Sequence, residues 1–369
     1  MRILHLAANR WWTGSADPTI RLVAGLRARG HRVLLGAIPG DRFETKAREA
    51  GLELVGGLRL DPRAGPAALA RDALRLRALV RAEAVDVIHA HHSHDHWLAI
   101  LARPRRGAGG RPPVVRTFHN LRAVKRDQLS ARLYRRTAAA LVVSRQIEVR
   151  CREVGFGAER VVWLPGVADL GRFAAGADPR PVREEFALGD APVIVSVARL
   201  APNRSHELLL DGFRLLLGTL PQARLLLVGK GEARDRLEAR VAALGLGDRV
   251  VFTGYRDRDL PEVLAAADCF VLMAAGSDES CRAALEAMAA ARPVVARRVG
   301  ALPETVVDGE TGLLLGEDEP VRVAEALLGV LADRARGRAM GAAGRRRAEA
   351  EFGLERSVEI VEALYRRLA

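Results

Sequence analysis

Short apolar runs alternate along the first half of the chain with amphipathic stretches and polar loops. The pattern predicts strands at Ile3–Ala8, Arg32–Ala37, Val85–Ala90 and Val114–Phe118, and a helix at Thr19–Arg29 that Gly30 ends. Parallel strands joined by helical crossovers produce this alternation. The first half therefore predicts a Rossmann-like sheet.

The second half repeats the scheme. Its predicted strands are Val193–Ala198, Ala223–Val228, Val250–Gly254, Cys269–Met273 and Pro293–Ala296, and its predicted helices are His206–Leu220, Ala233–Leu244 and Ser280–Ala291. A Gly- and Pro-containing stretch at 176–190 predicts a linker. We expect an α/β protein with two doubly wound, Rossmann-like domains, 1–175 and 191–351, that face an interdomain cleft. An amphipathic helix at 352–369 is expected to pack back toward the N-terminal domain.

Cysteine usage and hydropathy indicate where the protein works. The three cysteines, Cys151, Cys269 and Cys281, show no paired spacing, which favours a reducing compartment over disulfides or a zinc site. The apolar run at the N-terminus is too short for a signal peptide, and no apolar stretch approaches the roughly 18 residues of a membrane span. These features predict a cytoplasmic protein.

The positive charge is concentrated in the first half of the chain. Residues 1–190 hold 33 Lys and Arg against 19 Asp and Glu, whereas the remainder holds 25 against 26. A basic amphipathic segment at 122–136 suits an anionic membrane surface, and we expect peripheral binding at the inner face of the cytoplasmic membrane. Nucleic acid is disfavoured because no nucleic-acid-binding motif is present. An alternative is that arginines are simply scattered over solvated faces.

Two acids eight residues apart mark a strand–loop–helix junction. Asp278 falls in a polar loop, and Glu286 falls about two turns into the following helix, about 9 Å along its axis if the helix begins near Ser280. An elongated nucleotide-diphosphate sugar needs a carboxylate at each end with helix amides between them. A loop acid and an exposed helix glutamate without function are the alternative for this pair alone.

Two arginines follow the first strand of the second half. Arg199 leaves the strand end, and Arg204 stands just before the next helix, with Ser205 as the expected N-cap. Two guanidinium groups at a helix N-terminus can hold a diphosphate through charge-assisted hydrogen bonds. Exposed loop arginines are the alternative.

These segments together resemble the retaining glycosyltransferases of family 4, which have the GT-B fold. The segments that carry the resemblance are Ala198–Leu200, Arg204–His206, Val228–Gly231, Phe252–Gly254, Asp278 with Glu286–Ala289, Val299–Glu304 and Gly309–Leu314. The resemblance covers nearly all of residues 190–369 and is looser before them. Aspartate stands at the first acid of the family signature, and the glycines usual after it are absent.

The resemblance implies a role for each candidate residue. Glu286 would hold the donor ribose, Arg199 and Arg204 its diphosphate, and Asp278 the hydroxyls of its sugar. His119 would lie on the acceptor side of the reaction centre. The other expected substrate contacts are Gly14, Ser15, His91, Gly229, Gly254, Ser280, Cys281 and Arg282.

Five of the nine histidines lie in the segment His89–His96. A metal site is the sharper hypothesis, but this spacing offers no evident tetrahedral set. We expect one or two of these histidines to line the cleft and the others to lie at the surface. Arg199 and Arg204 would stabilise the departing diphosphate without a metal, so neither metal nor cofactor is expected, and the nucleotide sugar is a substrate.

The sequence thus predicts a metal-independent, retaining hexosyltransferase. Its donor is expected to be a UDP-sugar, with a GDP-sugar next, and its acceptor an envelope glycan, a lipopolysaccharide-type glycan or a lipid-linked glycan. A GT-B nucleotide-sugar epimerase and a non-catalytic nucleotide-sugar-binding protein are the alternatives.

Overall fold

A computed structural model describes residues 1–9, 14–104, 111–276 and 278–369. The chain forms two compact units. The first comprises Met1–Gly166, Asp278, Glu279 and the last segment, Leu354–Ala369. The second comprises Val167–Gly276 and Ser280–Gly353, and it includes helix α7 (Arg180–Glu185) from the stretch predicted as a linker.

The first unit contains a seven-stranded parallel sheet in the order β3-β2-β1-β4-β5-β6-β7. Its strands are β1 (Arg2–Ala7), β2 (Arg32–Ala37), β3 (Glu53–Leu54), β4 (Val87–Ala90), β5 (Val114–Phe118), β6 (Ala139–Val142) and β7 (Val161–Trp163). Its helices are α1 (Ala16–Ala28), α2 (Arg42–Glu49), α3 (Gly65–Ala82), α4 (Ser93–Ala102), α5 (Gln128–Arg135), α6 (Arg145–Glu153) and α15 (Leu354–Leu368). The stretch 101–152, which is rich in basic residues, includes 105–110, and these lie outside the described residues.

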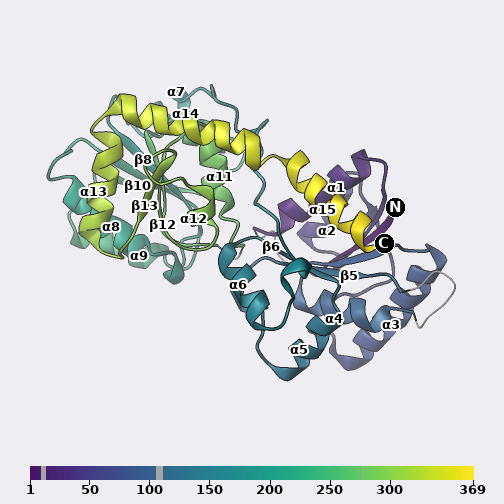
Figure 1. Cartoon of the computed structure of the whole chain (residues 1–369). Coiled ribbons are helices and arrows are strands. Elements are labelled where there is room, and N and C mark those ends of the chain that lie inside the picture. The colour runs from purple at the N-terminus through teal and green to yellow at the C-terminus, as the bar shows by residue number, and fades with distance from the viewer. Residues whose placement is uncertain (10–13, 105–110, 277) are drawn as a thin grey trace. The chain divides into compact units, whose positions relative to one another are not determined.

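Helix α15 joins the first unit although it comes from the far end of the chain. It packs beside α1, as Figure 1 shows for the yellow and purple helices. Gly25 makes this close approach possible, because a Cβ there would lie 2.5 Å from Cγ2 of Val358. Tyr365 of α15 is consequently fully buried against the sheet.

The second unit contains a six-stranded parallel sheet in the order β10-β9-β8-β11-β12-β13. Its strands are β8 (Val193–Val197), β9 (Arg224–Val228), β10 (Val250–Gly254), β11 (Cys269–Leu272), β12 (Val294–Arg297) and β13 (Gly312–Leu315). Its remaining helices are α8 (His206–Leu216), α9 (Arg234–Ala243), α10 (Leu260–Ala265), α11 (Arg282–Ala289), α12 (Leu302–Thr305), α13 (Pro320–Leu331) and α14 (Arg334–Glu351).

Both sheets reverse their strand order beside the first strand of the unit, as doubly wound domains do. The predicted fold class, two Rossmann-like α/β domains, is confirmed. The central strands are buried and mostly apolar because helices cover both of their faces. Among the described residues, no helix combines the length and apolar character that a membrane span requires.

Candidate functional site

Glycines bring the strand-end loops of the second unit close together. Gly229 follows β9 with φ +148°, and a Cβ there would lie 2.0 Å from the carbonyl oxygen of Ala198. Its amide donates to the carbonyl oxygen of Gly254, at 2.8 Å. The carboxyl ends of β8, β9 and β10 therefore meet at one edge of the sheet, the edge where parallel α/β domains bind ligands.

Arg199 and Arg204 both lie in the loop that leaves β8 at this edge. The Arg199 side chain is 65% exposed and pairs with Glu232, with 2.9 Å between Nη2 and Oε2. Arg204 is half-buried and donates from Nη1 to the carbonyl oxygen of Ala275. Burial, and then the positive charge of Arg199, lowers the pKa of Arg204. The two predicted cations are thus electrostatic neighbours, as a diphosphate site requires.

Ser205 occupies the N-cap position of α8, but the predicted cap is wrong. The residue has a left-handed backbone, with φ 55° and ψ 31°, and its side chain makes no cap hydrogen bond. Its Oγ instead accepts from Nη1 of Arg297, at 3.1 Å, and the same nitrogen donates to the carbonyl oxygen of Met273, at 3.0 Å. Arg297 thus ties the loop beside Arg204 to the end of β11.

Helix α11 begins at Arg282, two residues later than predicted, because Cys281 has a left-handed backbone with φ 54°. Glu286 consequently lies about 6 Å along the helix axis from its start, not about 9 Å. Glu286 is buried rather than exposed, and its Oε1 lies 3.3 Å from Nε of Arg282. Ser280 and Cys281, in the loop just before α11, are also buried. These loop residues, which were predicted to contact the sugar, therefore lead into the helix that carries the buried carboxylate of Glu286 and its partner Arg282.

Asp278 lies in the first unit, where it contacts His119. Nδ1 of His119 lies 3.1 Å from Oδ2 of Asp278, and both side chains are buried. The neighbouring Glu279 fastens this contact: its amide donates to the carbonyl oxygen of His119, and its Oε1 accepts from the amide of Leu121. Burial raises the pKa of the Glu279 carboxyl. Glu279 could not be predicted as an anchor from the sequence, because an acid in a polar loop is usually solvated.

His91 stands between this pair and the loop after β1. Its Nδ1 lies 3.4 Å from Nε2 of His119 and 3.3 Å from Oγ1 of Thr19, whose hydroxyl donates to the carbonyl oxygen of Ser15. Gly14 lies in the turn before Ser15 and is only half-buried. The structure thus brings His119, His91, Ser15 and Asp278 into one connected group.

The remaining histidines correct a prediction. His89 and His96 are buried rather than at the surface, because His89 lies within β4 and His96 packs under the sheet, with Nε2 2.7 Å from Oγ1 of Thr137. Within the described part of the chain, His5, His89 and His91 place one nitrogen each within 4.8 Å of one another, a spacing at which three histidines could hold a metal ion.

A basic hollow of about 280 Å³ opens beside His119 in the first unit. Its lining residues are His91, His92, Ser93, Arg116, His119, Asn120, Arg122, Ala123 and Lys125. Two buried nitrogens of this lining, Nε2 of His92 and Nε of Arg116, have no hydrogen-bond partner among the residues that the structure describes. Such donors, together with the ammonium of Lys125, suit an anionic group.

Arg116 is a candidate binding residue of this hollow that was not predicted from the sequence. Arg116 is buried in the middle of β5. Burial raises the pKa of the Asp95 carboxyl to about 7, and the positive charge of Arg116 partly offsets that rise. Asp95 in turn accepts from the amides of Ala8 and His92, at 2.9–3.1 Å. An arginine inside an otherwise apolar strand was the signal available in the sequence.

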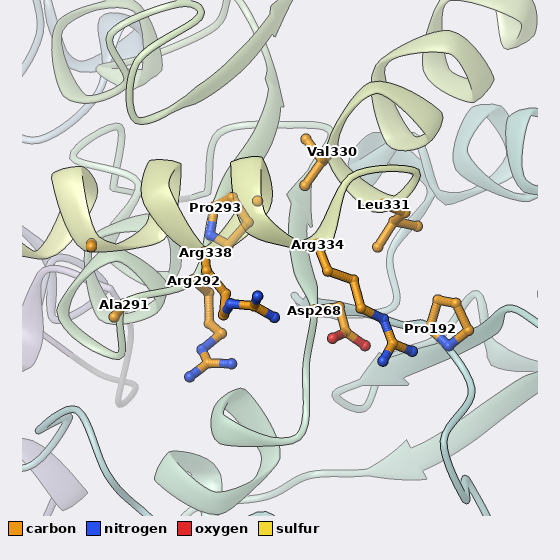
Figure 2. Close-up of a pocket in the computed structure, with 11 residues that line it drawn as sticks. Pro192, Asp268, Ala291, Arg292, Pro293, Val330, Leu331, Arg334 and Arg338 are labelled. Carbon is orange, nitrogen blue, oxygen red and sulfur yellow. The ribbon is translucent and has the colours of Figure 1, made fainter.

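A second hollow, of about 320 Å³, lies at the opposite edge of the second sheet, where strands β8, β11 and β12 begin. Figure 2 shows Arg334 and Arg338, from α14, beside Asp268 and Arg292. Arg292 is already bonded to the carbonyl oxygens of Ala290 and Ala267. None of the predicted site residues lines this hollow, and ligands of parallel sheets bind at the carboxyl ends of the strands instead.

Two doubly wound units, with two arginines at a strand-end loop and a buried glutamate in the helix after β11, have the features expected of a glycosyltransferase that uses a nucleotide sugar. The family model "Glycosyltransferase Family 4" matches residues 14–172, and "Glycosyl transferases group 1" matches residues 180–347. The chain belongs to glycosyltransferase family 4, as the sequence motifs predicted.

Curated relatives agree with this assignment. The GDP-mannose-dependent alpha-(1-6)-phosphatidylinositol monomannoside mannosyltransferase of Mycobacterium tuberculosis is 31% identical over 319 residues, which are 83% of this chain and 81% of that protein. The protein of the same name from Mycolicibacterium smegmatis is 38% identical over 190 residues, about half of each chain.

Solved structures share the whole fold. Anabaena Alr3699/HepE in complex with UDP and glucose superposes with a TM-score of 0.81, at 20% identity and with 100% of both chains covered. At this identity the likeness establishes the GT-B fold alone.

Proposed function

We propose that this protein transfers mannose from GDP-mannose to a phosphatidylinositol-type glycolipid, with retention of configuration at the anomeric carbon. The match to mannosyltransferases of that specificity over 83% of the chain is the observation that carries the proposal. It favours GDP-mannose over the UDP-sugar that ranked first in the sequence analysis.

The donor half of the proposal rests on the second unit and on Asp278. Arg199 and Arg204 would hold the diphosphate and stabilise the charge that develops as it leaves. The buried Glu286, kept in place by Arg282, would accept from the ribose hydroxyls. Asp278 would contact the mannose hydroxyls. Two arginines can neutralise the leaving diphosphate without a metal ion, so we expect full activity in the presence of EDTA.

The acceptor half rests on the basic hollow of the first unit. A phosphatidylinositol headgroup carries a phosphate, and the hollow offers the cations of Arg116, Arg122 and Lys125. The unpartnered Nε2 of His92 and Nε of Arg116 could donate to the phosphate or to an inositol hydroxyl. His119, which lines the same hollow, would then lie next to the acceptor.

The membrane half rests on the exposed basic strip of residues 122–136. Arg122, Lys125, Arg126, Arg132, Arg135 and Arg136 are all exposed there, and Leu129 of α5 is 61% exposed. Basic side chains around an exposed leucine suit the surface of an anionic bilayer. We therefore propose that the protein works as a peripheral protein at the inner face of the cytoplasmic membrane.

The proposal is tested by incubating the purified protein with radiolabelled GDP-mannose and phosphatidylinositol mannoside in phosphatidylglycerol vesicles. The expected result is label in the lipid fraction, with an α-linked product by NMR. Transfer from UDP-glucose but not from GDP-mannose would overturn the proposed donor. Donor binding with neither transfer nor hydrolysis would instead favour a non-catalytic nucleotide-sugar-binding protein, and release of free epimerised sugar nucleotide would favour an epimerase.

Two double variants separate the hollow from the membrane strip. R122Q/K125Q removes two charges from the hollow and should raise the KM for a water-soluble, deacylated phosphatidylinositol mannoside roughly tenfold. R132Q/R135Q removes two charges from α5 outside the hollow. It should leave that KM unchanged and weaken only binding to anionic vesicles, an effect that salt should diminish. Equal effects of both variants on the soluble acceptor would contradict the assignment of the hollow.

A further inference from the structure

Buried hydroxyl and imidazole groups in the first unit form a continuous series in which each group lies within hydrogen-bonding distance of the next. The members come from β1, β4, β5, the loops after these strands, and α15: His5, His89, His91, Thr117, His119 and Tyr365. All are at most 7% exposed. The contacts end on Asp278.

The contacts can be followed atom by atom. Oγ1 of Thr117 lies 2.6 Å from Nε2 of His89, and Nδ1 of His89 lies 2.5 Å from the Tyr365 hydroxyl. That hydroxyl lies 3.3 Å from Nε2 of His5, and Nδ1 of His5 lies 3.0 Å from Nε2 of His91. Nδ1 of His91 then lies 3.4 Å from Nε2 of His119, and Nδ1 of His119 lies 3.1 Å from Oδ2 of Asp278.

The position of two protons follows from groups outside the rings. The Thr19 hydroxyl donates to the carbonyl oxygen of Ser15, so its oxygen can only accept from His91, whose Nδ1 must carry a proton. The carboxylate of Asp278 also only accepts, so Nδ1 of His119 must carry a proton too. In both rings the proton therefore lies on Nδ1, the nitrogen that faces the Asp278 end of the series.

The remaining protons follow because a neutral imidazole has one donor and one acceptor nitrogen. Burial lowers the pKa of His91 and His89 well below the usual value and that of His5 to about 3, so these three rings are neutral. With Nδ1 of His91 protonated, its Nε2 must accept from Nδ1 of His5. Nε2 of His5 then accepts from Tyr365, which accepts from His89.

We propose that these residues form a single hydrogen-bonded chain, running in one direction from Thr117 to Asp278, in which all four imidazole rings carry their proton on Nδ1. In this arrangement His5, His91 and Tyr365 are positioning residues. They saturate Nε2 of His119, so His119 orients the Asp278 carboxylate rather than taking a proton from an acceptor hydroxyl. The catalytic consequence rests on the proposed sugar transfer, whereas the chain itself does not.

A metal ion is the rival for the same histidines. A cation bound by His5, His89 and His91 would need a lone pair from each ring. In the chain each of those lone pairs already accepts a hydrogen, from Tyr365, Thr117 and His5 respectively. The two arrangements are therefore mutually exclusive.

The first test is NMR of the full-length protein labelled with ¹⁵N-histidine, without substrate. The expected result is four histidines in the Nδ1–H tautomer, which is the opposite of the form that neutral histidine favours in water. Nε2–H signals for His91 or His119 would overturn the proposal. So would stoichiometric zinc that a His5→Gln substitution removes. Since no donor or acceptor is present, a wrong acceptor assignment does not affect this result.

The second test compares Tyr365→Phe with Thr137→Val. Tyr365→Phe removes the hydroxyl that joins His89 to His5. It should lower kcat, because the chain that positions His119 is interrupted, and leave the donor KM unchanged. It should also give a mixture of tautomers at His89, which loses the acceptor of its Nδ1 proton, while Asp278 keeps the proton of His119 on Nδ1. Thr137→Val removes a hydroxyl bonded to the buried His96, outside the chain, and should change neither readout.

Thr117→Val covers the case in which Tyr365→Phe fails to fold. Valine has the shape of threonine and suits a strand, so only the hydroxyl that donates to His89 is lost. The ¹⁵N signal of Nε2 of His89, which loses its donor, should shift. An unchanged kcat and an unchanged His89 signal in either folded variant would overturn the chain.

Discussion

The two units of this protein place their polar groups in opposite ways. The first unit buries them: imidazoles, Arg116, Asp95 and Asp278 lie inside, where each depends on a partner. The second unit keeps its paired cations at strand-end loops, where Arg199 is mostly exposed and glycines let the loops approach. The buried arrangement holds a fixed geometry, whereas the open one leaves cations available to a charged ligand.

The largest effect should come from the glycine that joins the loops of the second unit. Gly229→Ala would place a Cβ 2.0 Å from the carbonyl oxygen of Ala198, at a φ of +148° that alanine rarely adopts. We expect a loss of unfolding free energy of about 3 kcal/mol or more, measured by urea denaturation.

Gly247 provides the control for that substitution. A Cβ at Gly247 meets nothing within 4 Å, and its φ lies outside the left-handed range. Gly247→Ala should therefore be neutral or slightly stabilising. Equal destabilisation by both substitutions would mean that the loops of the second unit do not depend on Gly229.

The next effect concerns the cation that the open loops present. Arg204→Ala removes charge-assisted bonds to the donor diphosphate, each of which contributes roughly 1.5–3 kcal/mol, so turnover should fall roughly tenfold to a hundredfold. The fold should remain intact by circular dichroism. Arg224→Ala is the matched control, because Arg224 also donates to a backbone carbonyl oxygen but stands at the start of β9. Unchanged turnover of Arg204→Ala at saturating donor would remove the arginine from the mechanism.

The buried imidazoles should make the first unit sensitive to acid. Burial lowers the pKa of His5 to about 3, and that of His89 and His91 well below 6.5, so these rings stay neutral when folded and gain protons on unfolding. Folded stability is therefore complete above about pH 6.5 and falls as the pH falls. At pH 5 each such ring should lower the free energy of unfolding by about 2 kcal/mol relative to its value above pH 6.5.

The second unit offers the comparison. Among its described residues only His206 has a resolved histidine shift, to about 4. Asp95 of the first unit has the opposite effect on stability: because its pKa is raised to about 7, the folded state takes up a proton there as the pH falls, which favours folding. Amide hydrogen exchange, corrected for the intrinsic effect of pH, should show protection lost in the first unit before the second between pH 7 and pH 5. The reverse order would contradict the burial of neutral histidines.

The smallest effect concerns the exposed ion pair of the second unit. Glu232→Gln frees Arg199 from its partner, and since both side chains are more than half exposed, the free energy of unfolding should hardly change. Donor affinity should rise by up to about threefold, measured by calorimetry. A larger change in the free energy of unfolding or in donor affinity would show that the ion pair holds Arg199 more firmly than its exposure indicates.

Much of the fold could be predicted from the sequence because its signals are local. Strands β2, β5 and β10 have the predicted bounds, since each is a short β-branched or leucine-rich run bounded by loops. The first residue of α11 and the N-cap of α8 could not be predicted. In both places a non-glycine residue, Cys281 or Ser205, adopts a left-handed backbone that only the packing of the loop imposes.

The candidate site divides in the same way. Glu286 and the two arginines stand in recognisable motifs, so the sequence alone singled them out. Tyr365 and Thr117 could not be found that way, because their function depends on contacts between residues that lie far apart in the sequence, such as the 276 positions between His89 and Tyr365. A histidine within an apolar strand was the only local hint.

The most direct test of the account is hydrogen exchange of the full-length protein with and without saturating GDP-mannose. The account predicts new protection in the strand-end loops of the second unit, at residues 199–204 and 229–231, and in α11 around Glu286. Peptides of the basic hollow at 116–125 should change only when deacylated phosphatidylinositol mannoside is added. Protection by GDP-mannose confined to the hollow of the first unit would contradict the assignment of donor and acceptor to the two units.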